Sequence, residues 1–354
     1  MPSFFATGLV ALIAQSLAAF PTASAPEVEA ASRLPLTQLA GQAVIMRFAG
    51  NPAPAYVTEA LREGRAAGVI LFDDNATSPA ATKALTRELR RADEDALIAT
   101  DQEGGAIRIL EWAPPGPDQY LVATPAGARD AGQAAARALR SHGINVNLGP
   151  IADLSDPGSL MDARAFPGAT SEVTRLVEAS VGAYAGTGVA PTVKHFPGLG
   201  GAVGNTDDAQ VTIDRSAQDI RRTELRPFQA AIDAGAPAVM LSHAVYPALD
   251  ANAIASQSHA IVTGLLKDEM GFGGVAMTDS LEAFSVRSRM SMETAAVRSV
   301  RAGIDALLTT GPGTHLRAVR ALAAEARRDP EFRDRLTDAA ARTLALRRAL
   351  AEAD

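Results

Sequence analysis

Two aspartates stand directly after short apolar stretches of the 354-residue chain, at positions where a carboxylate could do chemistry. Asp279 ends the run Gly-Val-Ala-Met-Thr-Asp, and Asp101 opens the string Asp-Gln-Glu-Gly-Gly after another apolar run. Burying a lone charge costs free energy, so a carboxylate at such a position needs either a partner or a function. Helix N-capping is the alternative interpretation of Asp279. The two glycines after Glu103 would let a ligand approach the backbone closely.

A Lys-His pair lies in the segment 191–208, which reads Pro-Thr-Val-Lys-His-Phe-Pro-Gly-Leu-Gly-Gly-Ala-Val-Gly-Asn-Thr-Asp-Asp. We expect a short strand at 191–193, followed by Lys194, His195 and a glycine-rich loop. Lys194 is one of three lysines in the chain. A compact ammonium at a strand end suits the recognition of hydroxyl or carboxylate groups. The pattern is typical of an active-site loop, although a surface lysine and a core histidine would also fit.

The composition narrows the class of partner. The chain is 47% hydrophobic, carries a formal net charge of -7 and contains no basic run. This balance argues against nucleic acid or an anionic membrane as a partner, and it favours a small neutral ligand. The absence of cysteine excludes disulfides, a lipid-anchoring cysteine and cysteine metal sites. We expect a monomer without a stable membrane anchor.

The beginning of the chain has the features of an export signal. Residues 4–20 are an apolar run, too short and too interrupted to span a membrane comfortably, and Ala23-Ser24-Ala25 has the small-x-small pattern of a cleavage site. We therefore predict a signal peptide at 1–25, a Pro/Ala/Glu-rich linker at 26–33 and a secreted or periplasmic protein. An N-terminal helix or a membrane anchor is the alternative, because no Lys or Arg precedes the apolar run.

The remainder, 34–354, alternates strand-like and helical patterns, which is typical of the α/β class. Eight apolar runs are predicted strands: 43–48, 68–72, 97–100, 144–148, 191–193, 238–241, 274–278 and 304–309. Amphipathic helical patterns follow at 57–67, 79–92, 124–141, 171–187, 217–234, 258–270, 291–302 and 316–328. The alternation predicts a parallel sheet buried on both faces, and eight units predict closure into a single-domain (β/α)8 TIM-type barrel. An open doubly wound sheet is the competing architecture.

The positions of the polar residues favour the barrel. Asp101, Lys194, His195, His243 and Asp279 each lie at or just past the end of a predicted strand. Barrel enzymes place their reacting groups at this rim, so we expect these side chains to meet there. The tail, 330–354, predicts one more helix on the outside of the barrel.

Taken together, the motifs resemble those of glycoside hydrolase family 3. The matching strings are Asp101-Gln102-Glu103-Gly104-Gly105, Arg164-Ala165-Phe166, Lys194-His195-Phe196-Pro197-Gly198, Ser242-His243 and Thr278-Asp279-Ser280-Leu281. They occur in the family's order over nearly the whole predicted mature chain. Within the family, the chain is most similar to the single-domain bacterial β-N-acetylglucosaminidases.

The resemblance implies a retaining hydrolase on a (β/α)8 barrel that needs no metal or organic cofactor. It implies that Asp279 is the nucleophile, and that a carbohydrate is held by Asp101, Arg164, Lys194 and His195. His243 matches a family-typical position with a structural or substrate-binding role. The chemistry agrees, because an oxocarbenium-like transition state needs a carboxylate on one face and hydrogen bonds that strengthen as charge develops.

The sequence departs from the family pattern at two places. In the glucosaminidase branch, the loop after Lys-His-Phe-Pro-Gly leads to an Asp-Ser-His whose histidine is the acid/base. Counting without gaps puts Asn205 in the slot of that Asp and Asp207 in the slot of the His, so we predict that Asp207 is the general acid/base. The Arg expected after Asp-Gln-Glu-Gly-Gly is replaced by Ile109, with Arg108 one position early. A one-residue slip on a strand turns a side chain to the other face, which argues against sugar binding through Arg108.

The sequence thus predicts an exported exo-acting β-glycosidase. The resemblance points to a β-N-acetylhexosaminidase that acts on cell-wall or chitin-derived sugars through a covalent glycosyl intermediate on Asp279. Two alternatives stay open. One is a catalytically impaired sugar-binding homologue that has lost its proton-transfer groups, and the other is a β-glucosidase or β-xylosidase of the same family.

Overall fold

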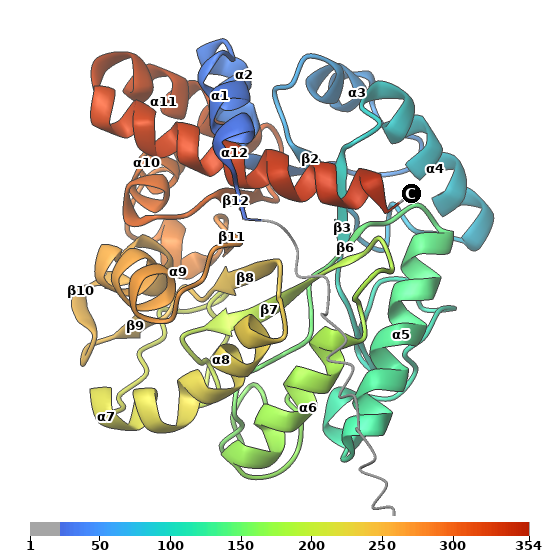
Figure 1. Cartoon of the computed structure of the whole chain (residues 1–354), viewed down its shortest axis with the longest axis vertical. Helices are drawn as coiled ribbons and strands as arrows, with labels where there is room; N and C mark the ends of the chain where they lie inside the picture. The colour runs from blue at the N-terminus through green and yellow to red at the C-terminus, as the bar shows by residue number, and fades with distance from the viewer. Residues whose placement is uncertain (1–21, 354) are drawn as a thin grey trace, which may run out of the picture.

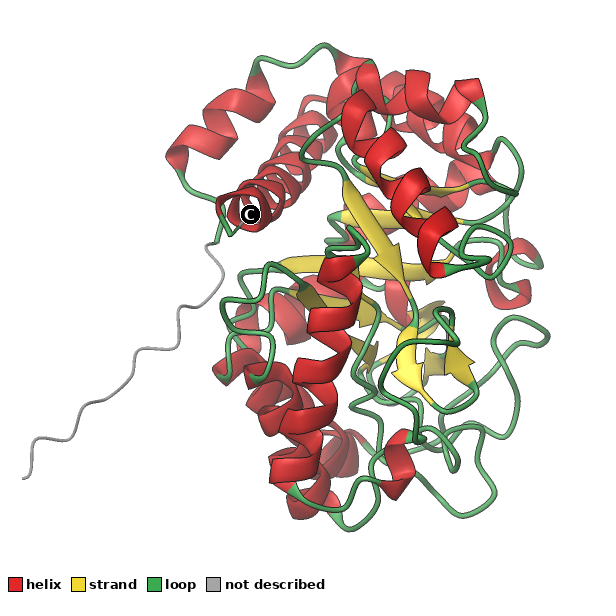
Figure 2. Cartoon of the chain, turned by 90° about the vertical axis from the view of Figure 1, so that its right-hand side faces the viewer, coloured by secondary structure: helices red, strands yellow, loops and turns green. Residues whose placement is uncertain are grey.

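The computed structural model describes residues 22–353, and a closed barrel of eight parallel strands forms its centre (Figure 1, Figure 2). The barrel strands are β1 (Val44–Arg47), β2 (Gly68–Ile70), β3 (Leu97–Thr100), β6 (Val146–Asn147), β7 (Ala190–Phe196), β8 (Ala238–Leu241), β11 (Val275–Ser280) and β12 (Ala306–Thr309). Each strand pairs with its neighbours in chain order, and β12 pairs with β1 through Val44 and Leu307. The predicted (β/α)8 barrel is confirmed, and the open doubly wound sheet is wrong.

The strands form where apolar residues can be buried on both faces. Every residue of β2, β3, β8 and β12 is buried. Inside the barrel, side chains such as Ile45, Leu97, Met240 and Leu308 belong to one buried cluster, and two further clusters fill the space under the helices. Parallel strands that are covered on both faces therefore have continuous apolar sequences. For this reason the apolar runs in the sequence were sufficient to locate these strands.

A helix follows each barrel strand, and together these helices surround the barrel (Figure 1). They are α3 (Ala55–Arg62), α4 (Pro79–Ala92), α5 (Pro125–Ser141), α6 (Thr170–Gly182), α8 (Leu225–Asp233), η4 (Ala260–Glu269), α10 (Met292–Ala302) and α11 (Thr314–Arg328). Side-chain caps start three of them, α4, α5 and α10. The Ala81 N–H donates to Ser78 Oγ over 3.2 Å before α4, and the Gly127 N–H donates to Thr124 Oγ1 over 3.1 Å before α5.

The helix predicted for 217–234 is interrupted. It consists of α7 (Ala217–Asp219), the π-helical segment η2 (Ile220–Glu224) and α8. Pro227 lies in the first turn of α8 and has no N–H to give to a carbonyl in the preceding turn. The irregular turn places Glu224 at the junction of η2 and α8, where its carboxylate faces the loop after β7.

The last helix, α12 (Pro330–Glu352), covers the end of the barrel at which the strands begin. Leu346 and Leu350 belong to the same buried cluster as the residues inside the barrel. Arg342 Nη1 donates to the Gly273 carbonyl just before β11. Helix α2 (Leu36–Gly41) packs against α11 and α12 nearby. The predicted C-terminal helix is therefore present, and it closes one end of the barrel as well as covering its outside.

The linker predicted at 26–33 is wrong, because most of this segment forms helix α1 (Ala25–Ser32). The Ser24 N–H donates to Glu27 Oε2 over 2.9 Å and Pro26 lies in the first turn, so the helix has a regular start. Ala31 is fully buried, and Glu27 pairs with Arg348 of α12, beside which α1 lies in Figure 1. Most of the predicted signal peptide, 1–25, lies outside the described residues.

Loops and short elements cover the carboxyl end of the barrel, where the strands finish. They include the hairpin β4 (Gln102–Gly104) and β5 (Ile107–Arg108), the hairpin β9 (Val245–Tyr246) and β10 (Asp250–Ile254), η1 (Gln119–Leu121), η3 (Ala255–Gln257) and α9 (Phe284–Arg287). None of the helices within 22–353 is both long and apolar enough to cross a membrane. The polar residues singled out in the sequence gather among these loops.

Candidate active site

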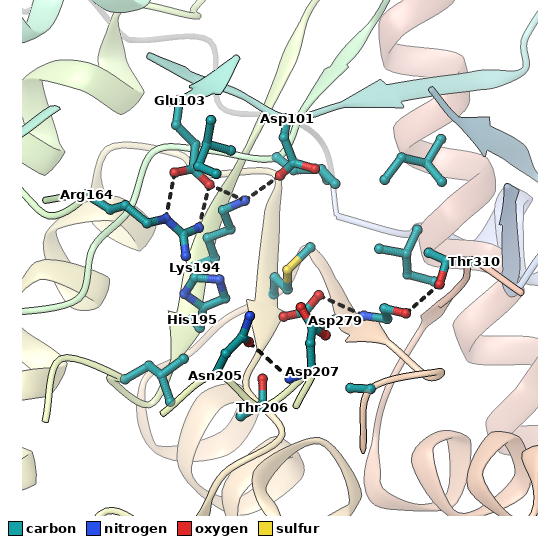
Figure 3. A pocket seen from close by; sticks show the side chains of 18 of the residues that line it. Asp101, Glu103, Arg164, Lys194, His195, Asn205, Thr206, Asp207, Asp279 and Thr310 are labelled. Atoms are coloured by element: carbon teal, nitrogen blue, oxygen red, sulfur yellow. Dashed lines mark hydrogen bonds and ion pairs between the residues drawn. The ribbon is translucent and has the colours of Figure 1, made fainter. Parts of the chain in front are cut away.

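A cavity of about 580 Å³ lies at the carboxyl ends of the barrel strands (Figure 3). Its walls come from β1, β2, β7, β8, β11 and β12 and from the segments that follow β3, β6, β7 and β11. Six of the seven predicted site residues line it, namely Asp101, Arg164, Lys194, His195, Asp207 and Asp279. They come from strands and loops separated by up to 178 positions in the sequence (279 − 101), so the closed barrel is what brings them together.

Lys194 forms the centre of a buried ion-pair cluster on one wall. Its Nζ lies 2.5 Å from Asp101 Oδ1 and 2.7 Å from Glu103 Oε1, and the residue is 3% exposed. Strand β7 continues to Phe196, so Lys194 is inside the barrel mouth rather than after the strand. Burial alone would lower the pKa of Lys194, but Asp101 and Glu103 outweigh it and raise the pKa. The alternative of a surface lysine is therefore wrong.

Glu103 joins this lysine to Arg164, which approaches from the loop after β6. Arg164 donates from Nε to Glu103 Oε2 over 3.0 Å and from Nη2 to Oε1 over 2.7 Å (Figure 3). Burial opposes ionisation of Glu103, yet Lys194 and Arg164 lower its pKa to about 2. Glu103 is thus a fixed anion that orients two cations. Residues two apart in an extended segment point to the same side, so the spacing of Asp101 and Glu103 could have revealed Glu103. Gln102, between them, points the other way and donates to the carbonyls of Leu110 and Pro114.

His195 is held by Asp153, a residue that the sequence analysis did not single out. Nδ1 of His195 lies 2.8 Å from Asp153 Oδ2, and Asp153 also accepts the N–H groups of His195 and Leu199. Because a carboxylate only accepts, Nδ1 carries the proton, and Nε2 has no bonding partner within 22–353. His195 lines the cavity, so its Nε2 can form a hydrogen bond with a ligand hydroxyl. Asp153 follows β6 in the string Gly149-Pro150-Ile151-Ala152, the one signal that could have located it.

Asp279 stands on β11 and lines the opposite part of the cavity. The next backbone N–H, that of Ser280, donates to Asp279 Oδ1 over 2.7 Å. Burial favours the neutral acid, but His195, His243 and Lys194 outweigh it and lower the pKa of Asp279. The helix α9 begins five residues later after Ala283, so Asp279 is not a helix cap. It is an ionised carboxylate at a cavity wall.

Asp207 reaches the same cavity from the loop after β7. Two main-chain hydrogen bonds fix this part of the loop to the segment after β11. The Phe284 N–H donates to the Asp207 carbonyl, and the Ser285 N–H donates to the Thr206 carbonyl, both over 3.1 Å. Partial burial and the charge of Asp279 raise the pKa of Asp207, even though the residue as a whole is exposed. Its neighbour Asp208 does not line the cavity.

His243 does not reach the cavity, so its predicted role in substrate binding is wrong. It is completely buried, and both ring nitrogens are engaged. Nε2 lies 2.9 Å from the Ser280 carbonyl and must donate to it, whereas Nδ1 lies 2.7 Å from Ser256 Oγ. Burial lowers the pKa of His243, which favours the neutral ring. The strand-end position was correctly located, but the side chain holds the backbone next to Asp279.

Arg108 is also directed elsewhere, as its one-residue shift predicts. Ile107 lines the cavity, and Arg108 does not. The Nη1 group of Arg108 lies 3.4 Å from the Gly116 carbonyl, within the loop after β3. Strand β5 therefore turns its arginine away from the site.

The wall made by β1 and β12 contains two charged residues that the sequence analysis missed. Arg47, the last residue of β1, lies over the Phe72 ring at 4.8 Å and pairs with Asp74 at 3.2 Å. Glu282 accepts from the Thr310 N–H over 2.8 Å through Oε2, whereas its Oε1 is buried without a hydrogen-bond partner within 22–353. Both residues line the cavity. Neither belongs to a distinctive local string, so only the closed barrel identifies them.

No group of three or more His, Asp or Glu side chains suited to hold a metal ion occurs within 22–353. The acidic residues of the cavity are instead paired with Lys194 and Arg164 or stand singly at its wall. The arrangement can therefore bind a polyhydroxylated ligand and present two carboxylates to it. One of these has a lowered pKa and the other a raised pKa, the combination expected of a nucleophile and a proton donor.

Comparisons with known proteins bear on this site. Residues 36–346 match the profile described as the glycosyl hydrolase family 3 N terminal domain. A protein of Arthroderma benhamiae named "Uncharacterized secreted glycosyl hydrolase" is 36% identical over 289 residues, 77% of this chain and 81% of that protein. A Xanthomonas oryzae pv. oryzae protein named "Beta-hexosaminidase" is 31% identical over 280 residues, 76% of this chain and 84% of that protein.

Solved structures that are similar to this chain have similar names. A glycoside hydrolase family 3 β-N-acetylglucosaminidase from Paenibacillus sp. superposes with a TM-score of 0.85 at 32% identity, over 90% of this chain and 63% of that one. A β-N-acetylhexosaminidase from Beutenbergia cavernae superposes with a TM-score of 0.79 at 31% identity, over 89% of this chain and 98% of that one. The likeness thus extends over most of the described chain.

Proposed function

The chain belongs to glycoside hydrolase family 3 and is a glycoside hydrolase, and on this premise we propose that it is a retaining, exo-acting β-N-acetylhexosaminidase. The observation that supports this most is the pair of carboxylates in one cavity. Asp279 has a lowered pKa and Asp207 a raised pKa. Environments that separate two carboxyl pKa values in this way assign one group to nucleophilic attack and the other to proton transfer.

In the proposed first step, the Asp279 carboxylate attacks the anomeric carbon, and the glycosidic bond breaks. Asp207 gives its proton to the departing oxygen, so the products are an alcohol and a covalent glycosyl ester of Asp279. In the second step, Asp207 takes a proton from water, and the water oxygen displaces Asp279 with a second inversion. The anomeric configuration is therefore retained. Activity should fall as the pH rises through the raised pKa of Asp207, because the proton donor is then lost.

The sugar ring would lie against the ion-pair cluster of Lys194. Asp101, Arg164 and Lys194 offer a carboxylate and two cations to the hydroxyl groups, and His195 offers Nε2. These groups are oriented before substrate arrives because Glu103 and Asp153 fix them. Charged hydrogen bonds that are already in place cost little reorganisation as positive charge develops on the sugar. A cavity of about 580 Å³ suits the end of a sugar chain, which supports exo action.

The wall formed by Arg47 and Glu282 supports an N-acetyl sugar in particular. An acetamido group carries both an acceptor, the carbonyl, and a donor, the N–H. Arg47 is a donor whose side chain is 34% exposed, and Glu282 is an acceptor that lines the same cavity. We infer that an acetamido carbonyl accepts from Arg47 while its N–H donates to the carboxylate of Glu282. The names of two relatives, a β-hexosaminidase and a β-N-acetylhexosaminidase, agree with this preference.

We also propose that the protein is exported and acts on cell-wall or chitin-derived sugars. The predicted signal peptide at 1–25 supports export, and a relative at 36% identity is named as secreted. The reaction proposed here requires only protein carboxylates and water, so no cofactor is part of it.

A panel of aryl β-glycosides tests the proposal. We expect turnover of the N-acetylglucosaminide to exceed that of the glucoside and xyloside, and a slow substrate should leave one sugar mass on the peptide that contains Asp279. A preference for glucose or xylose would identify a different glycosidase of the same family. Saturable sugar binding with no release from any aryl glycoside would instead show a sugar-binding homologue.

A further inference from the structure

Glu224 is a buried acid that the proposed mechanism does not use. It is 1% exposed, and neither carboxylate oxygen has a hydrogen bond within 22–353. Its charged neighbour is Arg215, whose Nη1 lies 3.3 Å from Glu224 Oε1. Burial raises the pKa of Glu224 to about 7; Arg215 acts against the rise, while Asp153 and Asp156 add to it. The protonated and ionised forms are therefore both populated near neutral pH.

The carboxylate of Glu224 lies directly on the loop that follows β7. A Cβ on Gly198 would come within 2.6 Å of Glu224 Oε2, and Gly198 has a φ of +121°. Only glycine allows both this conformation and this close approach. The Gly198 carbonyl accepts from Tyr246 Oη over 2.8 Å on its other side. The first residue of the glycine-rich loop is thus enclosed between Glu224 and Tyr246.

Arg215 extends the contact from Glu224 to a second loop, the one that follows β6. Its Nη2 lies 2.6 Å from Asp156 Oδ2 of that loop. The two loops also meet through their backbones, because the Asp156 N–H donates to the Gly200 carbonyl over 3.1 Å and the Leu160 N–H donates to the Ala202 carbonyl over 2.8 Å. A Cβ on Gly200 would collide with the Leu154 carbonyl at 1.3 Å. Close packing therefore explains Gly198 and Gly200 of this loop.

The two loops joined in this way carry groups of the site. The loop after β6 provides Arg164, and the loop after β7 provides Asp207. Their relative position sets the distance between the sugar-binding cluster and the proposed proton donor. A displacement of about 1 Å at such a site can cost on the order of 10²-fold in rate.

We propose that Glu224 and Arg215 are positioning residues that hold these two loops together, and that ionisation of Glu224 tightens this hold while its protonation loosens it. Arg215 bridges two carboxylates when Glu224 is ionised. When Glu224 is neutral, Arg215 keeps only Asp156, whose side chain is 57% exposed and whose attraction is screened by water. The proposal rests on the proposed function only in that the loops carry Arg164 and Asp207.

The other charged or titratable groups around this pair do not replace Arg215. Asp153 and Asp156 face it from the segment after β6, and Asp219 of α7 acts on Arg215. All three are acidic, so they favour a neutral Glu224 and a charged Arg215. Tyr246 of β9 is fully buried, and burial raises its pKa well above the usual range, so it stays neutral. The change in this pair near neutral pH is therefore the gain or loss of a proton by Glu224, while Arg215 stays charged and Tyr246 stays neutral.

Hydrogen–deuterium exchange of the full chain tests the proposal without depending on catalysis. The readout is the protection of residues 198–213 at pH 6 and pH 8, corrected for the intrinsic pH dependence of exchange. We expect higher protection at pH 8 in the wild type. Glu224→Gln keeps the shape of the neutral acid but cannot ionise, so its protection should equal the wild-type value at pH 6 at both pH values.

Glu269→Gln is the matched control, because it removes an exposed Arg–Glu pair, with Arg221, outside these loops. It should follow the wild type at both pH values. A wild type whose protection does not change with pH, or a Glu224→Gln variant that keeps the wild-type change, would overturn the proposal.

A kinetic readout separates positioning from simple loss of structure. With an aryl glycoside whose leaving group departs unprotonated, we expect kcat of Glu224→Gln to equal that of the wild type at pH 6 and to be lower by about tenfold at pH 8. Equal losses at both pH values would indicate a structural role and overturn the proposal. If no aryl glycoside is turned over at all, the proposed function fails, while the exchange result still decides the role of Glu224.

Discussion

Two lysines that form ion pairs, one at each end of the barrel, have opposite electrostatic surroundings. At the carboxyl end, Lys194 lies between the carboxylates of Asp101 and Glu103, and its pKa is raised. At the amino end, Lys267 contacts both oxygens of Asp305 at 2.9 Å. Burial, together with the nearby arginines 335 and 342, lowers the pKa of Lys267 to about 8 despite Asp305.

The two clusters also differ in how completely they are closed. Asp305 is fully buried and accepts from Lys267, from Arg335 over 2.6 Å and from the Ala276 N–H over 2.9 Å. Arg335 belongs to α12, so this cluster fastens the last helix to the barrel. The Lys194 cluster faces the cavity instead, and Asp101 has a side-chain exposure of 19%. Its groups are oriented by one another but still have room for a ligand.

The comparison shows that buried ion pairs occur both in a binding site and in the scaffold of the barrel. The two clusters differ in the balance of charges around the lysine and in whether one side of the cluster faces a cavity. Barrel proteins place chemistry at the carboxyl ends of the strands and stability at the other end. The first four predictions below test this division, from the largest expected effect to the smallest.

Substitution of the nucleophile should have the largest effect. Asp279→Asn removes the group that forms the covalent ester, so kcat should fall by about 10³-fold or more. The melting temperature should remain close to that of the wild type, because within 22–353 the Asp279 side chain accepts only from the adjacent Ser280 N–H. Steady-state kinetics and thermal unfolding check this. Wild-type activity in the variant would remove Asp279 from the mechanism.

Matched substitutions of the two lysines test the comparison itself. Lys194→Met should lower kcat/KM by about 10–100-fold, the loss of one charged hydrogen bond of about 1.5–3 kcal/mol. Lys267→Met should leave kcat/KM unchanged and lower the free energy of unfolding by about 1–3 kcal/mol, because Asp305 loses a buried donor. Kinetics and urea unfolding of both variants are the measurements. If Lys267→Met impaired kcat/KM as much as Lys194→Met, the division between the two ends would be wrong.

The pH dependence of stability should distinguish the amino-end cluster. The folded state lowers the pKa of Lys267 from 10.5 to about 8, so between these values the unfolded chain binds more protons. The free energy of unfolding should therefore gain a contribution as the pH rises from about 8 to about 10.5. Unfolding curves for the wild type and Lys267→Met over this range provide the test. An identical slope in both proteins would show that Lys267 does not titrate as described.

The smallest effect is expected at Arg108. Its side chain contacts the loop carbonyls of Pro115 and Gly116 and does not line the cavity. Arg108→Ala should therefore change kcat/KM by less than about twofold, as for an ordinary surface substitution of ±0.5 kcal/mol. A loss as large as that of Lys194→Met would mean that Arg108 reaches the sugar after all.

Much of the fold could be predicted because parallel barrel strands have a distinctive sequence. The runs at 97–100 and 238–241 coincide with β3 and β8, since burial on both faces makes them continuous and apolar. The predicted end of the strand at 193 was too early. Lys194 and His195 are polar, and only their partners Asp101 and Asp153 make it possible to bury them within β7.

The site was predictable where a residue belongs to a distinctive string and not where its role depends on a distant partner. Asp153 holds His195 across 42 positions, and only the string Gly149-Pro150-Ile151-Ala152 before it could have located it. His243 was placed correctly at a strand end, but which way it turns is decided by Ser256 and the Ser280 carbonyl. The helix α1 was read as a linker because its few apolar side chains are matched by the surface of α12, which a local pattern does not reveal.

The most direct test of the central claim is azide rescue of Asp207→Ala. Asp207 is proposed to protonate the leaving group and to activate water, so the variant should cleave an alkyl glycoside at least about 10²-fold more slowly than the wild type and a nitrophenyl glycoside with little loss in the first step. Azide needs no base and should restore turnover on the nitrophenyl glycoside by releasing the sugar from Asp279 as the β-glycosyl azide. An α-glycosyl azide, or wild-type turnover of the alkyl glycoside without azide, would contradict the account.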